Sequence, residues 1–144
     1  HHAVYQGVDI SDESIQIEQH SLDDVAVTFT NHPSELFGTV YRAGGLGDSA
    51  ATVAVFPVDP RYWSDFGWAP RRLRTVRTTE AGRFEVLGLP AGKYRIAAYA
   101  DAAGNEWANL TDMIQGLSRI AETVDVKDGE RTSIDLMTTL GAKR

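Results

Sequence analysis

The sequence contains no cysteine, which excludes disulfide bonds, thiolate metal sites and cysteine nucleophiles and leaves the cellular compartment open. No apolar run approaches the ~18 residues of a membrane-spanning helix, so we expect no membrane insertion. Basic residues are outnumbered: 14 Lys and Arg against 20 Asp and Glu give a net charge of −6. This balance argues against nucleic acid or anionic lipid as the main partner. G-x-S-x-G, Walker and dinucleotide-binding motifs are also missing, so we expect no enzyme activity and no cofactor.

The 144 residues are enough for one domain with a short appendage. Apolar and polar residues alternate with a period of two, in short segments separated by turn residues, which predicts a mostly β protein. Residues 1–34 are expected to be a lead-in, with short strands over 4–10, 15–17 and 25–29. The opening His-His pair resembles the remnant of an affinity tag and no basic or apolar leader precedes it, so we expect an excised fragment.

A main domain is expected over residues 35–140, followed by a frayed tail over 141–144. Its strands are predicted at 36–42, 52–58, 73–78, 83–87 and 93–100. The segment 52–58 is apolar on both faces, which is typical of a central strand. Turns at 79–82 and 89–92 predict that the last three strands form a meander, and broken alternation in 73–78 indicates a bulge or an edge.

One segment follows the helical period instead. Apolar residues from Leu110 onward recur at i, i+3, i+4, i+7 and i+10, which predicts a short amphipathic helix over 110–121. Asn109 or Thr111 could cap its N-terminus, and we expect it to cover one edge or end of the sandwich. A later Asp-Gly pair predicts a final hairpin between strands near 124–126 and 134–136.

Three motifs in the main domain point to a known family. They are G-x-V at 38–40, T-x-x-G-x-F at 79–84 and L-P-x-G-x-Y at 89–94. Together they resemble the carboxypeptidase regulatory-like family of transthyretin-like β-sandwiches, over residues 35–137. The resemblance implies an antiparallel Greek-key β-sandwich of about seven strands, with Phe84 and Tyr94 in one core. It also implies attachment to larger extracytoplasmic bacterial proteins, such as peptidases, outer-membrane receptors and surface adhesins, and no activity.

Relatives of this family that carry chemistry lack a match here. Related adhesin repeats form an internal isopeptide bond with an acid on the strand after the tyrosine, where this chain has alanines at 97–98. Hydroxyisourate hydrolases end in Tyr-Arg-Gly-Ser, whereas this chain ends in Gly-Ala-Lys-Arg. We therefore expect neither chemistry.

Two acidic turns have some character of a metal site. His32 and Glu35 are spaced as H-x-x-E, a zinc-binding spacing, but no histidine follows that could be a third ligand. Asp9, Asp12 and Glu13 could offer oxygens to calcium, but their spacing does not match an EF-hand loop. We expect exposed, solvated turns at both places and no bound metal.

The segment 59–77 stands apart from the rest of the chain. It holds four of the 13 aromatic residues and five of the 11 arginines, within a chain that is otherwise acidic. Rings and guanidinium groups suit sugar stacking, an acidic partner or a protein interface. The candidate binding residues are Tyr62, Trp63, Phe66, Trp68, Arg71, Arg72 and Arg74. Alternatively, the tryptophans fold back over the sandwich edge while the arginines pair with the acidic surface.

These observations lead to two hypotheses. In the first, the chain is a non-catalytic accessory module of a larger bacterial extracytoplasmic protein, contacting other domains of its parent or a separate protein, or spacing domains. In the second, it is a carbohydrate-binding module that stacks a glycan on Trp63 and Trp68. Rings packed against Phe56 or the helix would favour the first.

Overall fold

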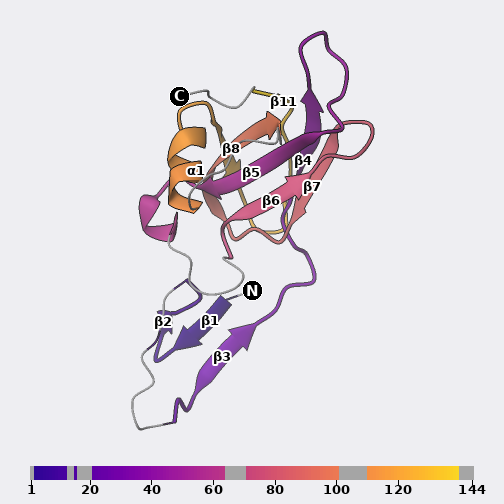
Figure 1. The fold of residues 1–144 in the computed structure, drawn as a ribbon. Coiled ribbons are helices and arrows are strands. Elements are labelled where there is room, and N and C mark those ends of the chain that lie inside the picture. The colour runs from indigo at the N-terminus through magenta and orange to yellow at the C-terminus, as the bar shows by residue number, and fades with distance from the viewer. Residues whose placement is uncertain (1, 13–14, 16–20, 64–70, 101–109, 140–144) are drawn as a thin grey trace.

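The computed structural model describes residues 2–12, 15, 21–63, 71–100 and 110–139 (Figure 1). Its elements are β1 (His2–Tyr5), β2 (Val8–Asp9), β3 (Val25–Thr28), β4 (Glu35–Tyr41), β5 (Ala51–Pro57), the 3-10 turn η1 (Pro60–Trp63), β6 (Arg74–Arg77), β7 (Arg83–Leu87), β8 (Gly92–Ala100), α1 (Leu110–Leu117), β9 (Glu122–Val126), β10 (Arg131–Ser133) and β11 (Leu136–Met137). Within these residues α1 is the only α-helix, so the predicted mostly β class is confirmed.

The strands from β4 onward form a two-sheet sandwich. One sheet has the order β6-β5-β8-β9 and is antiparallel throughout. In the other, β4 pairs with β7 antiparallel and with β10 and β11 in parallel. The segments β10 and β11 keep one offset of 96 residues to β4 (131 − 35 and 136 − 40), so they are one interrupted strand. With these two counted as one, the sandwich has the expected seven strands.

Two predicted connections are wrong. No final hairpin forms, because β9 pairs with β8 whereas β10 pairs with β4, so the turn at 127–130 carries the chain between the sheets. The expected meander is also divided between sheets: β6 and β8 flank β5, and β7 lies beside β4. Residues that favour a tight turn occur both in hairpins and in connections between two sheets. The local sequence pattern therefore did not distinguish the two kinds of connection. The edge position of β6 is as predicted.

The predicted central strand is β5, whose seven residues are all buried. Val53 and Val55 face the core between the sheets, which also contains Phe84 and Tyr94 as expected. Phe56, on the opposite face of β5, belongs to a second apolar cluster beneath α1. The two faces of β5 thus belong to two separate cores, which explains why its sequence does not alternate.

The helix α1 departs from the prediction in place and length. The helix lies beside β5 and β8 (Figure 1). Its side chains Met113, Ile114 and Leu117 pack on the outer face of the β5–β8 sheet, not on an edge or end of the sandwich. It ends at Leu117 instead of 121, and the Ile120 and Ala121 amides both donate to the Leu117 carbonyl in the turn that follows. Of the two expected caps, Thr111 lies inside the helix and Asn109 lies outside the described residues.

The N-terminal residues form a separate three-stranded antiparallel sheet with the order β2-β1-β3, which we call the N-terminal sheet. The expected strand over 4–10 is wrong, because a tight turn at Gln6 and Gly7, with φ of 50° and 81°, divides it into β1 and β2. The strand at 25–29 is found as β3. Of the expected strand at 15–17, Ile15 is not in a strand and the rest lies outside the described residues.

Candidate binding site

The aromatic and arginine-rich segment begins with a tight turn directly after β5. The Asp59 carboxylate accepts hydrogen bonds from the backbone and the guanidinium of Arg61, and these bonds lower the pKa of Asp59. The Tyr62 amide donates to the Asp59 carbonyl at 3.2 Å. This local network forms the 3-10 turn and directs Trp63 back toward the sheet.

Trp63 is bound to the sandwich. Its indole nitrogen donates to the Pro57 carbonyl at 2.8 Å. Its ring meets Phe56 edge to face, with 6.1 Å between ring centroids and 84° between planes, and packs on the cluster beneath α1. Trp63 therefore follows the alternative in which the ring covers the sandwich. Phe66 and Trp68 lie outside the described residues.

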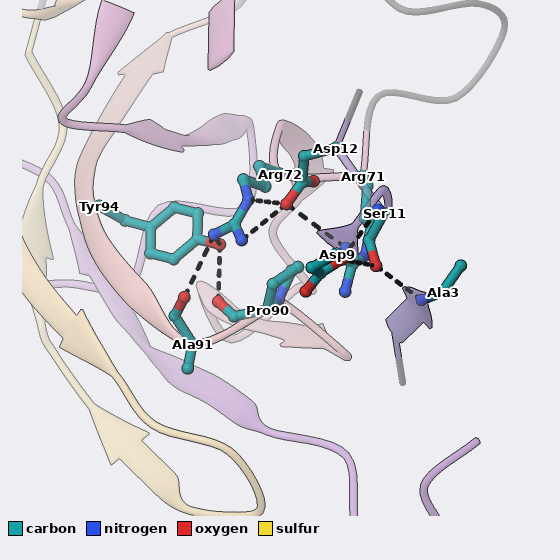
Figure 2. Close-up of polar contacts among 9 residues, drawn as sticks. All are labelled: Ala3, Asp9, Ser11, Asp12, Arg71, Arg72, Pro90, Ala91 and Tyr94. Atoms are coloured by element: carbon teal, nitrogen blue, oxygen red, sulfur yellow. Dashed lines mark hydrogen bonds and ion pairs between the residues drawn. The ribbon is translucent and has the colours of Figure 1, made fainter. Parts of the chain in front are cut away.

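Arg72 is the centre of the polar contacts in this segment (Figure 2). Its Nε and Nη2 atoms both lie 2.8 Å from Oδ2 of Asp12. Its Nη1 atom donates to the Ala91 carbonyl and to the Tyr94 hydroxyl, each at 3.2 Å. The guanidinium carbon also lies 4.9 Å from the ring centroid of Tyr62, a cation–π contact.

A second arginine reaches the same carboxylate. Nη1 of Arg71 lies 3.4 Å from Oδ2 of Asp12. The side chains of Asp12 and Arg72 are only 17% and 19% exposed, so this pairing is more sheltered than an ordinary surface ion pair. We call Asp12, Tyr62, Arg71, Arg72 and Tyr94 the Asp12–Arg72 cluster.

Burial and charge act in opposite directions on the two sandwich residues of this cluster. Burial by itself would lower the pKa of the Arg72 guanidinium, but its hydrogen bond to Asp12 and its attraction to Tyr94 raise that pKa on balance. Burial raises the pKa of the Tyr94 hydroxyl, and the positive charge of Arg72 only partly offsets this. Tyr94 therefore stays a neutral phenol, which donates to the Pro90 carbonyl at 2.7 Å and accepts from Arg72.

The turn after β2 presents Asp12 to the arginines. Ser11 donates from its amide and its hydroxyl to Asp9, and these bonds lower the pKa of the Asp9 carboxyl. The Ala3 amide donates to the Ser11 hydroxyl at 2.8 Å, which ties the turn to β1. The expectation of a solvated turn is therefore wrong for Asp12, and Glu13 lies outside the described residues.

The structure brings together only part of the predicted site. Tyr62, Arg71 and Arg72 meet in the cluster, whereas Arg74 begins β6 and donates to the Leu73 carbonyl. Sequence reasoning considered Asp12 only as a possible calcium ligand in a solvated turn and missed its pairing with Arg71 and Arg72. It assigned Tyr94 to the core alone, although the L-P-x-G-x-Y motif places this hydroxyl beside the carbonyls of its own turn.

Residues of the H-x-x-E segment at 32–35 make contacts within the protein. Glu35 accepts two hydrogen bonds from Arg131, at 2.6 and 2.8 Å, which lower the pKa of the Glu35 carboxyl. Ser34 is buried and donates to the Leu89 carbonyl, so this part of the expected exposed turn is wrong. Over the ranges that the structure describes, no three His, Cys, Asp or Glu side chains gather as a metal site would require.

The N-terminal sheet exposes an apolar face that sequence reasoning did not identify. Tyr5 pairs with Val8 on one side and with Val25 on the other, so the three side chains share a face, and Val27 continues it. Val8 and Val27 are 59% and 56% exposed, and Phe29, just beyond β3, is 86% exposed. We call these five residues the apolar face.

Comparison with known proteins finds no matching family model and no matching curated protein. Solved structures that resemble the chain include the Bacillus anthracis TIE protein (17% identity, TM-score 0.44), the Streptococcal ancillary pilin (15%, 0.49) and catechol 1,2-dioxygenase from Acinetobacter sp. ADP1 (14%, 0.42). The matches cover 74%, 78% and 75% of this chain but only 16%, 34% and 53% of those structures. At these identities and TM-scores the likenesses carry no function to this chain. Within the described residues, no helix has the length and apolar character to cross a membrane.

Proposed function

We propose that the chain is a non-catalytic interaction module of a larger extracytoplasmic bacterial protein, built on a sandwich of the carboxypeptidase regulatory-like kind. Its task in this proposal is to hold a neighbouring domain of its parent. The observation that carries the proposal is the apolar face, because large contiguous apolar surfaces on a folded domain generally mark contact sites.

The open edge of the N-terminal sheet supports this assignment. Among the described strands, β3 pairs with β1 alone, and each of its four residues is exposed. An extended segment of a neighbouring domain could add to β3 as a further strand, bonding through its backbone while its alternate side chains cover Val25 and Val27. The contact would protect an edge that otherwise favours aggregation.

Charge defines the partner more closely. The first 34 residues contain six Asp and Glu and no Lys or Arg. A second copy of the same sheet would bring the same negative charge, which opposes self-association. The fitting partner is a segment with alternating apolar side chains and with Lys or Arg beside them.

The carbohydrate-binding alternative is less well supported. The indole N–H of Trp63 is already bonded to Pro57, and its ring packs on Phe56. Glycan stacking on the segment 59–77 would depend on Phe66, Trp68 and Tyr62, and it stays a prediction.

Hydrogen exchange tests the proposed contact. The β3 amides should exchange at least tenfold more slowly in a protein that contains the neighbouring domains than in this chain alone. A Val27→Thr/Phe29→Ser variant should lose that protection, whereas Met137→Thr, at a site on β11 that is 55% exposed, should keep it. Equal exchange of β3 with and without the neighbours would contradict the proposal, as would protection that rises with the concentration of the isolated chain.

A further inference from the structure

We propose that the Asp12–Arg72 cluster is a carboxylate-binding site of the sandwich that Asp12 fills in cis, and that an Asp or Glu side chain of a partner protein takes the same place when the N-terminal sheet moves away. This site is separate from the apolar face, so the inference does not rest on the proposed function.

The sandwich positions Arg72 without help from Asp12. The Ala91 carbonyl, the Tyr94 hydroxyl and the Tyr62 ring hold the guanidinium on its inner side, and all three belong to the sandwich or to the turn after β5. Tyr94 is itself fixed by its bond to Pro90. The arginine therefore keeps its orientation when the carboxylate leaves, and such preorganisation lowers the cost of binding a replacement.

The Asp12 carboxylate uses only one of its two oxygens to bind the arginines. Nε and Nη2 of Arg72 and Nη1 of Arg71 all converge on Oδ2 of Asp12. Among the described residues, Oδ1 of Asp12 has no partner. A guanidinium binds a carboxylate best through two parallel hydrogen bonds, one to each oxygen. A side chain that approaches from another direction could form both bonds, so Asp12 is a replaceable ligand.

The N-terminal sheet can leave as a unit. The turn that holds Asp12 is anchored to the N-terminal sheet. Ser11 donates to Asp9 of β2, and Ala3 of β1 donates to Ser11. The residues that join β3 to β4 are exposed over 29–33, and within the described part of the chain the hydrogen bonds of Thr30 and His32 stay inside that linker. The Asp12 contact thus fastens the N-terminal sheet to the sandwich at a point that a competing carboxylate can take.

A peptide in trans tests the site in the full chain. The probe is a fluorescein-labelled, C-terminally amidated synthetic peptide with the sequence of residues 2–12, so that the side chain of its final aspartate is the carboxylate nearest its end. It should bind the Asp12→Ala chain at least tenfold more tightly than the wild-type chain, because in the wild type the tethered carboxylate competes at a high effective concentration. A probe peptide with asparagine in place of its final aspartate should bind the Asp12→Ala chain at least tenfold more weakly.

Charge-matched variants separate the site from general attraction. Adding Arg72→Gln to Asp12→Ala should abolish binding, whereas adding Arg77→Gln, an exposed arginine at the far end of β6, should not. Circular dichroism shows whether each variant folds. If Asp12→Ala/Arg72→Gln does not fold, Asp12→Ala/Arg71→Gln takes its place, because this variant leaves the Arg72–Tyr94 contact intact. Three outcomes would overturn the proposal. The probe could bind the wild-type and Asp12→Ala chains equally, it could fail to bind the Asp12→Ala chain, or the Arg77→Gln change could reduce binding as much as Arg72→Gln does.

Discussion

The position of Trp63 gives a direct test of whether the aromatic segment is structural. Trp63→Ala removes the edge-to-face contact with Phe56, the hydrogen bond to the Pro57 carbonyl and the cover over the apolar cluster beneath α1. Because all three contacts are within the sandwich, their loss should reduce the stability of the folded chain.

The structure sets the size of this effect. An aromatic pair contributes about 1 kcal/mol beyond its burial. A typical hydrogen bond contributes a similar ~1 kcal/mol. Truncation of a fully buried large aromatic residue costs about 3–5 kcal/mol, and Trp63 is only half-buried. Since these contributions overlap, the free energy of unfolding should fall by about 2–3 kcal/mol, which corresponds to a drop of roughly 8 °C in Tm for a chain of this size.

Urea unfolding followed by circular dichroism measures the change without using tryptophan fluorescence. Trp63→Phe keeps a ring but loses the N–H donor, so it should lose about half as much stability. Arg61→Ala removes the exposed guanidinium bonds to Asp59 but keeps the backbone bonds of the turn, so it should shift the midpoint much less than Trp63→Ala does. A Trp63→Ala midpoint equal to that of the wild type would refute the structural role and return Trp63 to the candidates for glycan stacking.

Two further predictions concern the turns of the sandwich. Gly82→Ala should lower the free energy of unfolding by about 2 kcal/mol, because Gly82 has φ +77° and a Cβ would lie 2.6 Å from the Val40 carbonyl oxygen. In urea titrations, Gly44→Ala, at φ +103° with open space around it, should lose less. A hydrogen bond from Thr138 lowers the pKa of Asp48 below its ordinary value, so this group contributes stability above that ordinary pKa and loses it as the pH falls through the lower folded-state pKa. Between pH 5 and 2, stability should therefore fall more steeply in the wild type than in Asp48→Asn, and parallel curves would contradict this.

The features that the sequence predicted correctly are those fixed by neighbours along the chain. The two apolar faces of β5, the turn that requires Gly82 and the start of α1 all follow from periodicity or from backbone conformation. The pairing of strands does not follow from periodicity or from backbone conformation. The Asp-Gly turn before β10 is compatible with a hairpin to β9, and only the position of β4, almost 100 residues earlier, decides that β10 joins the other sheet.

The candidate site divides in the same way. The composition of 59–77 identified Tyr62, Arg71 and Arg72 as unusual because the excess of rings and guanidinium groups is visible in the sequence. Their partner Asp12 lies 60 residues before Arg72, and nothing in the sequence distinguishes it from the other acidic residues of the first segment. The choice between a ring that binds a ligand and a ring that covers a core depends on Phe56, and the apolar pattern of β5 alone does not locate this side chain beside Trp63.

The two proposed contacts are linked through the N-terminal sheet, which carries the apolar face and also holds the turn that presents Asp12 to the sandwich. The apolar face includes Val25 of β3 and Tyr5 of β1, which pair directly, while Ala3 of the same β1 strand donates to Ser11, next to Asp12. A partner strand that adds to β3 and changes the twist of this sheet therefore acts on the turn that presents Asp12 to Arg72. If occupation of β3 weakens the Asp12 contact, then by thermodynamic necessity a carboxylate bound at Arg72 strengthens binding at β3 by the same factor. The N-terminal sheet would then be the element that couples recognition of a basic, apolar strand at one surface to recognition of an acidic side chain at the other.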